Sequence, residues 1–367
     1  MRQEKKQVIG IIATKGVNRP ATKQDPFPGR TATFREISRL ARLEGVSVAV
    51  FSPWSIDQKR KQVRAHIYVP GKGWMKSAIP LPRVIYNRVA NRRMEARPRV
   101  QRLLRWLKSE GVVVFNPRFL DKWEVYACLQ ADPEIKPHVP ETVLYENFRQ
   151  LLHCLREWRT VYSKPRRGSL GSGIAVIRLT ADGTVVIKRN SADVGTQITR
   201  LRHPAALRRW TARYLRPERV CLQKGIKMAT AAGRRFDIRA LVQKDETGTW
   251  RFTGAAARLA GHGQITTHVP RGGRRMSLDK ALHAVWRDGA KVKRIKADLA
   301  ALTQNAAQSL ETALADNFGE FSLDVGVDNA GRLWIFEMNA KPFRFDEPKI
   351  RYEAYRRLVG FSKHLAE

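Results

Sequence analysis

The chain has 367 residues, of which 43% are hydrophobic, and it carries 69 Lys and Arg residues against 33 Asp and Glu residues. This length predicts two or three packed units, and the apolar content excludes a mainly disordered chain. The formal net charge of +36 fits either a well-solvated surface or an acidic partner such as a nucleic acid, an anionic polymer or a polyanionic assembly. The three scattered cysteines, Cys128, Cys154 and Cys221, are too few for a disulfide framework or a zinc site.

The first apolar run, VIGIIA at 8–13, is too short for a signal-peptide core or a membrane span. We therefore expect a soluble cytoplasmic protein in a reducing environment.

The first third of the chain alternates strand and helix patterns. Strands are predicted at 8–13, 46–53, 83–87 and 111–117, with helices over 34–45 and at about 92–108. A strand–helix–strand order is typical of a parallel α/β unit, so we predict such a unit over residues 1–116.

Beyond Pro117 the pattern changes to longer strands with fewer helices between them. The predicted elements are a helix at 121–129, strand–glycine-rich loop–strand at 160–179, a strand at 183–190, a basic helix at 204–215, a strand and turn at 219–226, paired strands at 234–245 and 250–261, a helix at 292–317 and a helix at 347–367.

Two acids interrupt the apolar stretch FSLDVGVDNAGRLWIFEMNAKP at 321–342. It predicts a hairpin that turns at residues 328–331. Glu337 and Asn339, two residues apart on a strand, face the same side, and the turn brings Asp324 beside them. An edge hairpin with solvent-facing acids is the plain alternative. Both strands are apolar, however, and unpaired buried carboxylates are costly, so we interpret the three oxygen-bearing side chains as Mg²⁺ ligands.

A lysine at a strand end precedes a glycine-rich turn in SKPRRGSLGSGI at 163–174. Glycines let backbone amides surround phosphate oxygens, and Lys164 adds a positive charge. Many glycine-rich hairpins are simple turns, and this one is not a Walker A loop. Together with the acidic hairpin downstream, this loop indicates a phosphate-binding site, because a metal ion that prefers oxygen ligands also binds phosphates.

Seven segments carry a family resemblance. They are GRTATFRE (29–36), VIYNRVANRR (84–93), FNPRFLDKWEVY (115–126), SKPRRGSLGSGI (163–174), FDIRALVQ (236–243), HVPRGGR (268–274) and LDVGVD with IFEMNAKP in the acidic hairpin. On these the sequence resembles the ATP-grasp superfamily and, more narrowly, the YheC/YheD-type endospore coat-associated proteins.

The resemblance implies an α/β (α+β) ATP-grasp fold with the nucleotide between antiparallel sheets. The implied units are a Rossmann-like pre-ATP-grasp domain over 1–116, a lid subdomain with the glycine-rich loop over 117–222, a core subdomain with the metal site over 223–346, and a C-terminal helix over 347–367.

The resemblance also implies residue roles. Lys122 and Lys164 correspond to the two nucleotide-contacting lysines, and Asp324, Glu337 and Asn339 to the Mg²⁺ ligands. Arg239 and Arg258 correspond to arginines at the reaction centre. The remaining nucleotide contacts are Gly168, Ser169, Gly171 and Gly173 in the loop and Gln223, Lys224 and Ile226 in the adenine-covering hinge. Each has a plain alternative: a surface lysine for Lys122, an ion-pair residue for Arg239, and turn residues for the hinge.

One position departs from related peptide-forming ligases. They carry an asparagine before an x-x-Arg-Gly-Gly loop, where this chain has His268 followed by Arg271, Gly272 and Gly273. The change bears on the identity of the acceptor.

The implied activity is an ATP- and Mg²⁺-dependent ligation in which a carboxylate from a small molecule or peptide is activated as an acyl phosphate and joined to an amine. The alternative is a coat component that binds ATP with little turnover and docks on an acidic polymer or on spore coat proteins. A nucleic-acid-binding protein is a third possibility that the charge alone supports, because no recognised binding module is apparent.

Overall fold

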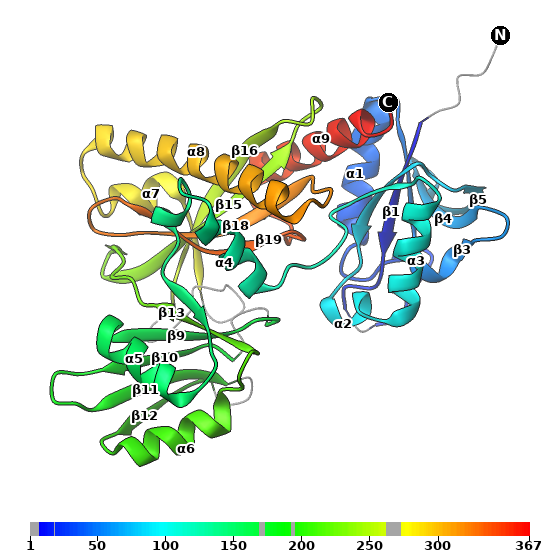
Figure 1. Cartoon of the computed structure of the whole chain (residues 1–367). Helices are drawn as coiled ribbons and strands as arrows, with labels where there is room; N and C mark the ends of the chain where they lie inside the picture. The colour runs from blue at the N-terminus through cyan, green and yellow to red at the C-terminus, as the bar shows by residue number, and fades with distance from the viewer. Residues whose placement is uncertain (1–6, 18, 169–172, 192–194, 262–272) are drawn as a thin grey trace, which may run out of the picture.

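The computed structural model describes residues 7–17, 19–168, 173–191, 195–261 and 273–367 (Figure 1). These residues form three β-sheets that follow one another along the chain. In Figure 1 the N-terminal sheet lies on the right, the second sheet at the lower left and the third above the second. Among the described helices, none combines the length and the hydropathy that crossing a membrane requires.

The N-terminal sheet has a parallel core. Its strands are β1 (Val8–Ala13), β2 (Ser47–Phe51), β3 (Ile56–Asp57), β4 (Gln62–Val69), β5 (Gly73–Pro80), β6 (Val84–Arg88) and β7 (Val113–Phe115). They lie in the order β3-β4-β2-β1-β6-β7, with β5 on β4. The pairs β1–β2, β1–β6 and β6–β7 are parallel, as predicted for an α/β unit. The antiparallel hairpin β4–β5 was not predicted.

Helices cover both faces of this sheet because β1 is apolar on both sides. Ile9 and Ile11 pack in the cluster that includes α1 (Thr31–Leu43), whereas Ile12 packs in the cluster that includes α3 (Pro98–Ser109). The single helix predicted over 92–108 is wrong in one respect. It is divided into α2 (Arg92–Glu95) and α3, because Pro98 begins α3 and holds the preceding residue in an extended conformation.

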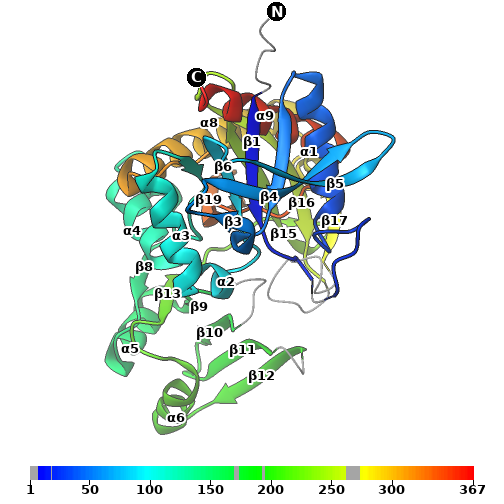
Figure 2. The same ribbon diagram turned by 90° about the vertical axis from the view of Figure 1, so that its right-hand side faces the viewer.

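The second sheet is antiparallel throughout. Its strands are β8 (Thr142–Leu144), β9 (Thr160–Pro165), β10 (Ala175–Leu179), β11 (Val185–Ser191), β12 (Gly195–Leu201) and β13 (Val220–Lys224), in the order β12-β11-β10-β9-β13-β8. Helices α5 (Phe148–Trp158) and α6 (Pro204–Tyr214) supply Leu151, Leu155 and Leu207 to its core. The glycine-rich segment joins β9 to β10. Figure 2 shows β10–β12 and α6 projecting below the rest of the molecule.

The third sheet holds the acidic hairpin. Its strands are β14 (Thr230–Ala231), β15 (Arg234–Lys244), β16 (Trp250–Leu259), β17 (Arg274–Ser277), β18 (Glu320–Val327) and β19 (Leu333–Asn339), in the order β17-β16-β15-β18-β19 with β14 on β15. The other elements nearby are α4 (Lys122–Ala131), α7 (Leu278–His283), α8 (Gly289–Leu314) and the short 3-10 turn Lys136–His138, while a second 3-10 turn, Pro53–Ser55, lies between β2 and β3 of the N-terminal sheet.

The two faces of this sheet differ in polarity. Ile238, Ala240 and Leu323 lie on the face that packs in the core shared with α8. The opposite face carries polar side chains from the alternate positions of β15 and β18, among them Gln243, Glu320 and Ser322. The strands therefore alternate as a half-buried sheet should, but their polar face is turned toward the N-terminal sheet and not toward solvent.

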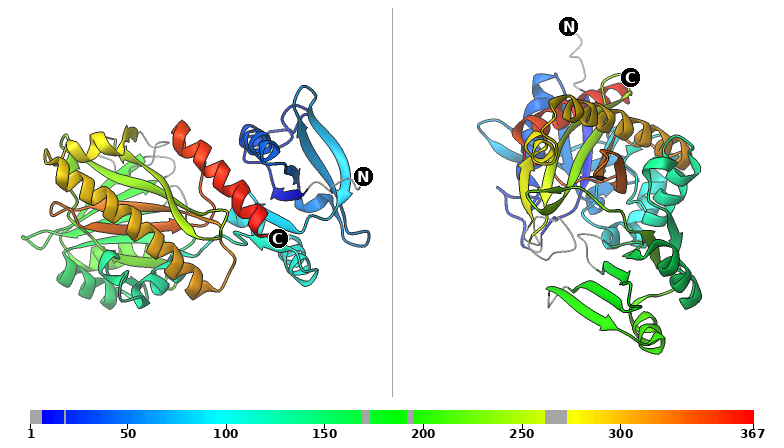
Figure 3. Two further views of the ribbon diagram at one scale, coloured as in Figure 1. Left: turned by 90° about the horizontal axis from the view of Figure 1, so that it is seen from above. Right: turned by 90° about the vertical axis from the view of Figure 1, so that its left-hand side faces the viewer.

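The C-terminal helix α9 (Pro348–His364) connects the third sheet to the N-terminal sheet. Tyr355, Leu358 and Phe361 pack in one apolar cluster with residues of β1, α1 and β15. The left view of Figure 3 shows α9 between the two sheets. The predicted helix over 347–367 is thus confirmed as a helix, while the division of the chain into domains at 116, 222 and 346 stays a prediction.

Candidate functional site

A cavity of about 890 Å³ lies between the polar face of the third sheet and the N-terminal sheet. The third sheet contributes Asp324, Glu337 and Asn339 to its wall, together with the two predicted arginines. The N-terminal part contributes the end of β6 and the residues that follow it, together with Gly16, Val17, Arg19, Asp25, residues 29–35 and Ile37. The cavity therefore gathers predicted site residues with a region for which no site role was predicted.

The acidic hairpin has the predicted geometry. Asp324 on β18 is directly opposite Glu337 on β19, and Ser322 is opposite Asn339. A register shift follows Asp324, where the strand passes into its apolar half. All three oxygen-bearing side chains line the same cavity. Two acids directly across a strand pair repel each other, so the arrangement requires positive charge nearby.

Two cations supply that charge. Lys122 Nζ, at the start of α4, lies 2.9 Å from Glu337 Oε1. Arg258 on β16 lies 2.8 Å from Asp324 Oδ1 through one terminal nitrogen, and it also donates to both carboxylate oxygens of Asp237 at 2.8 and 2.9 Å. Burial acts to lower the pKa of Arg258, but the carboxylates of Asp324 and Asp237 outweigh burial and raise it. Arg258 is therefore a permanent positive charge at this site.

The donor set fits Mg²⁺. Two carboxylates and one amide offer the hard oxygen atoms that this ion prefers, and the cavity leaves room for water and phosphate. In the part of the chain that the structure describes, no three His, Cys, Asp or Glu side chains gather as a metal cluster. The predicted Mg²⁺ ligands are two carboxylates and the amide of Asn339, so they do not form a cluster of that kind.

Lys164 lies at the end of β9, buried on the inner side of the acidic hairpin. Its Nζ donates to the Tyr126 hydroxyl at 3.1 Å, to Gln223 Oε1 at 2.5 Å and to the Phe336 carbonyl at 3.2 Å. Burial lowers the pKa of Lys164 to about 8, against the opposing effect of the Glu337 carboxylate. Lys164, on the second sheet, therefore contacts Phe336 of the third sheet, the residue just before the predicted metal ligand Glu337.

The predicted hinge residues are placed differently from one another. Gln223 is buried and, besides accepting from Lys164, donates to the Thr142 hydroxyl at 2.9 Å. Lys224 Nζ pairs with Glu141 at 2.5 Å on the surface, and its backbone N–H donates to the Glu141 carbonyl at 2.8 Å. Ile226 is partly exposed just beyond β13. No cofactor role is tested by these contacts, so the hinge roles stay predictions.

The glycine-rich loop is described only at its ends. Gly168 lines the cavity, and its carbonyl accepts from Lys122 Nζ at 3.0 Å. Gly173 has a φ of +73°, a conformation that favours glycine. Ser169 and Gly171 lie outside the described residues, as do His268, Arg271 and Gly272, while Gly273 is described just before β17.

Arg239 lies on β15 directly opposite Asp324 of β18. One terminal nitrogen donates to the Phe343 carbonyl at 3.1 Å, and the guanidinium stacks 5.1 Å from the Phe345 ring centroid. Its Nε is buried, and among the described residues it finds no acceptor. Burial lowers the pKa of Arg239, with the Asp324 carboxylate opposing.

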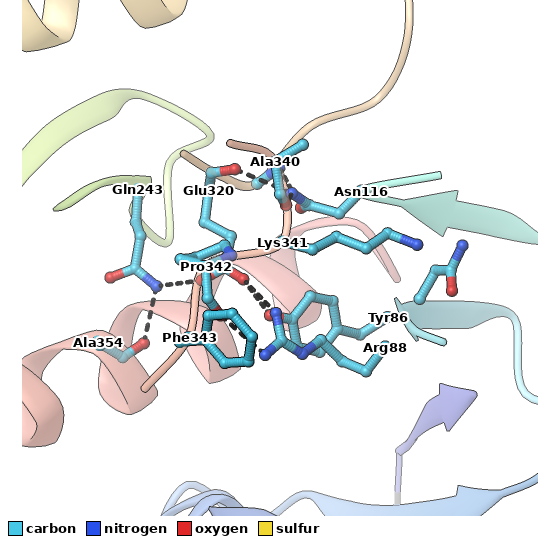
Figure 4. Close-up of polar contacts among 12 residues, drawn as sticks. Tyr86, Arg88, Asn116, Gln243, Glu320, Ala340, Lys341, Pro342, Phe343 and Ala354 are labelled. Carbon is cyan, nitrogen blue, oxygen red and sulfur yellow. Dashed lines mark hydrogen bonds and ion pairs between the residues drawn. The ribbon is translucent and has the colours of Figure 1, made fainter. Parts of the chain in front are cut away.

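Sequence reasoning missed a polar network that joins the N-terminal sheet to the third sheet. The Tyr86 hydroxyl donates to Glu320, and Arg88 lies 3.4 Å from the same carboxylate and donates to the Pro342 carbonyl at 2.9 Å. Gln243 donates to Glu320 at 3.2 Å from the neighbouring strand. Figure 4 shows these side chains converging beside Lys341, which pairs with the buried Glu95. The segment VIYNRVANRR was noted for its predicted strand and its family resemblance, and no site role was predicted for it.

Comparison with known proteins places the chain in a family. The profile of YheC/D-like ATP-grasp domains matches residues 111–365. The chain belongs to the YheC/D-like ATP-grasp family. It is 28% identical to the endospore coat-associated protein YheD of Bacillus subtilis (strain 168) over 348 residues, which cover 93% of this chain and 76% of YheD. The corresponding protein YheC of the same strain is 24% identical over 311 residues, 84% of each chain.

Solved structures show the same ATP-grasp fold. D-cycloserine synthetase DcsG aligns with a TM-score of 0.54 at 14% identity, covering 98% of this chain and 99% of that one. The ATP-grasp ligase PsnB, complexed with a minimal precursor, Mg and ADP, aligns with a TM-score of 0.51 at 11% identity, covering 98% and 97% of the two chains. The predicted fold class is therefore confirmed.

Proposed function

We propose that this chain is an ATP- and Mg²⁺-dependent ligase that activates a carboxylate as an acyl phosphate and joins it to an amine. The observation that supports it best is Asp324 directly opposite Glu337, with Asn339 also in the wall of a cavity that Arg239 and Arg258 line. The family membership agrees with this reaction class.

In the proposed reaction a substrate carboxylate oxygen attacks the γ-phosphorus of ATP. The bond from that phosphorus to the β,γ-bridging oxygen breaks, and ADP leaves with the electron pair. An amine then attacks the acyl carbon, gives up a proton and displaces inorganic phosphate. Negative charge develops on phosphoryl and acyl oxygens in both steps. Arg258, which pairs with Asp324, and Arg239, which is opposite Asp324 on the neighbouring strand, would stabilise it.

The same proposal assigns the remaining residues. Asp324, Glu337 and Asn339 would hold Mg²⁺, which when bound neutralises phosphate charge. Lys122 and Lys164 would contact the phosphates together with the glycine-rich loop. Lys122 would do so by exchanging its present partner, Glu337, for a phosphate oxygen.

Two measurements on the purified full chain test the proposal. ATP should raise the melting temperature more with Mg²⁺ than without it. A screen of carboxylates, each with and without amines, should then reveal one that releases ADP and phosphate above the background hydrolysis. If ATP fails to stabilise the protein in the presence of Mg²⁺, the nucleotide site is wrong.

A second candidate is a structural coat component that binds ATP with little turnover. It is favoured by the formal net charge of +36 and by the names of the relatives, which record coat association and not a reaction. On this view the basic surface docks on an acidic polymer or on coat proteins. ATP stabilisation without ADP release from any carboxylate, together with steeply salt-dependent binding to an acidic polypeptide, would favour it. A mobility shift of nucleic acid at moderate salt tests the third possibility.

A further inference from the structure

The cavity beside the acidic hairpin carries more positive than negative charge. Ten Arg and Lys side chains line it against four carboxylates, and each of those carboxylates already has partners. Asp324 and Glu337 belong to the candidate metal site, Glu320 is held by Tyr86 and Arg88, and Asp25 pairs with Arg19 and Thr31. Among the residues that the structure describes, several cavity cations are therefore left without an anionic partner.

The unmatched charge is concentrated on the N-terminal wall. Arg92, the first residue of α2, stacks 5.2 Å from the Phe119 ring centroid and forms no ion pair with any residue that the structure describes. Burial lowers the pKa of Arg92, and the carboxylate of Glu337 is the strongest influence opposing this, so Arg92 lies within electrostatic range of the candidate metal site. Arg92 lines the same cavity as Asp324 and Glu337, and it belongs to the N-terminal part of the wall.

Arg30 adds a second cation to this wall. It donates to the carbonyls of Arg88 and Ala90 and meets no carboxylate within the described ranges. Burial, together with the neighbouring Arg88 guanidinium, lowers the pKa of Arg30 to about 9. Arg30 and Arg92 line the same cavity, and neither forms an ion pair with a described residue, so an anion bound by both would gain two charge-assisted contacts.

Arg239 faces the same space from the third sheet, and its Nε–H is a buried donor without an acceptor in the described structure. Leaving such a buried donor unpaired is unfavourable, and a bound anion can offset this cost. Arginine forks suit carboxylates because they can donate two parallel hydrogen bonds.

We infer that the carboxylate substrate of this site carries at least one further anionic group, which Arg92 and Arg30 hold on the N-terminal wall while the reacting carboxylate lies near Arg239 and Arg258. The substrate class is then a polycarboxylate, such as the end of an acidic peptide, and not a simple monocarboxylate. Arg92 is a specificity-determining residue. The inference rests on the proposed function for the reacting carboxylate, but the second anion subsite can be measured without turnover.

The probe pair is tri-L-glutamate and tri-L-glutamine, which have nearly the same shape and differ in side-chain charge. Calorimetric titration of the full chain, without nucleotide or Mg²⁺ and at moderate salt, should show one saturable site for tri-L-glutamate and none for tri-L-glutamine. Arg92→Gln should weaken that binding about tenfold, the loss expected for one charge-assisted contact. Arg92→Lys, which keeps the charge but loses the fork, should fall between the two.

Arg294→Gln is the matched control, because Arg294 lies on α8 with its side chain 83% exposed and outside the cavity. It should leave tri-L-glutamate binding unchanged. Equal losses in the Arg92 and Arg294 variants would show that the probe responds to net charge alone, and the inference would be wrong. Equal binding of both peptides would overturn it as well.

Two further experimental outcomes distinguish a failure of this inference from a failure of the proposed function. If Arg92→Gln weakens Mg²⁺–ADP binding as much as tri-L-glutamate binding, Arg92 belongs to the nucleotide phosphates and the inference fails while the proposed function stands. If the peptide results are as expected but ATP never stabilises the chain, the proposed function fails and the polyanion subsite remains. Unchanged melting temperatures in the absence of ligand show that the Arg92 variants fold.

Discussion

Glu320 and Asp324 lie on the same face of β18, four residues and about 13 Å apart along the strand, yet their environments differ. Glu320 is buried, and neutral donors from two other strands hold it together with Arg88. Burial raises the pKa of Glu320, with Arg88 opposing. Asp324 and its neighbour Glu337 have side chains 14% and 20% exposed, and each is paired with a long cationic side chain.

Glu320 is bonded to neighbouring strands in a way that stabilises the fold, whereas we propose that Asp324 and Glu337 bind a ligand. The partners of Glu320 come from β6 and β15 and hold the N-terminal sheet against the third sheet. Lys122 pairs with Glu337, and Arg258 pairs with Asp324, from elements outside the hairpin. A metal ion that binds the exposed carboxylate oxygens can replace these ion pairs. We expect substitutions at Glu320 to change stability and substitutions at Glu337 to change turnover.

Glu337→Gln gives the largest expected effect. The amide keeps the size of the side chain but removes a charged ligand for Mg²⁺, so ADP release should fall about a thousandfold, as expected when charge stabilisation of a transferring phosphoryl group is lost. The measurement is ADP formation with the best carboxylate from the screen. Asp328→Asn is the control, because Asp328 caps the turn of the same hairpin and does not line the cavity. Full activity in Glu337→Gln would refute the metal assignment.

Glu320→Ala tests the other side of the comparison. It leaves Arg88 buried without its anion and removes the acceptor of Tyr86 and Gln243, which should lower the free energy of unfolding by about 3 kcal/mol. Urea denaturation followed by tryptophan fluorescence measures this. Glu320→Gln retains an acceptor for Tyr86 and should lose less. An Ala variant as stable as the unchanged protein would show that the network does not hold the sheets together.

The two acids also differ in how far the sequence could reveal them. The position of Asp324 opposite Glu337 could be predicted because it depends on two local properties, a short turn and the alternation of side chains between the two faces of a strand. The contact of Lys122 with Glu337 spans 215 positions and was not predicted, although the family resemblance implied that both residues belong to one site. Glu320 and Arg88 meet across 232 positions, and no local pattern distinguishes them from ordinary strand residues.

The N-terminal wall was missed for the same reason. The segments that supply Arg30 and Arg92 were noted as family segments, but their position opposite the acidic hairpin depends on how α9 and the two sheets pack. The hairpin β4–β5 was missed although Gly71 lies in its turn and Gly73 begins β5, because its polar strands lack the apolar run by which the other strands were recognised.

A double-mutant cycle tests whether Lys122 can be replaced by a bound metal ion as the partner of Glu337. Without Mg²⁺, Lys122→Met and Glu337→Gln should be coupled by about 2 kcal/mol in the free energy of unfolding, because Lys122 is buried and pairs with this carboxylate. With saturating Mg²⁺ and ADP the coupling should shrink, since the carboxylate then has another cation. Coupling of the same size in both conditions would indicate a permanent structural pair, like that of Arg88 and Glu320.

The smallest expected effect concerns pH. Because burial lowers the pKa of Lys164 to about 8, this lysine loses its charge in the ligand-free protein well below the ordinary lysine pKa of 10.5. A phosphate binds the charged form better, so ADP binding must take up a proton above pH 8 and its affinity should fall as the pH rises. The expected loss is about tenfold at one unit above the pKa. Titration of ADP between pH 7.5 and 9 measures it, and Lys164→Met should bind ADP weakly at every pH without the decline. An unchanged affinity across this range in the native sequence, or the same decline in the methionine variant, would remove Lys164 from the phosphate site and leave it as a buried structural residue like Glu320.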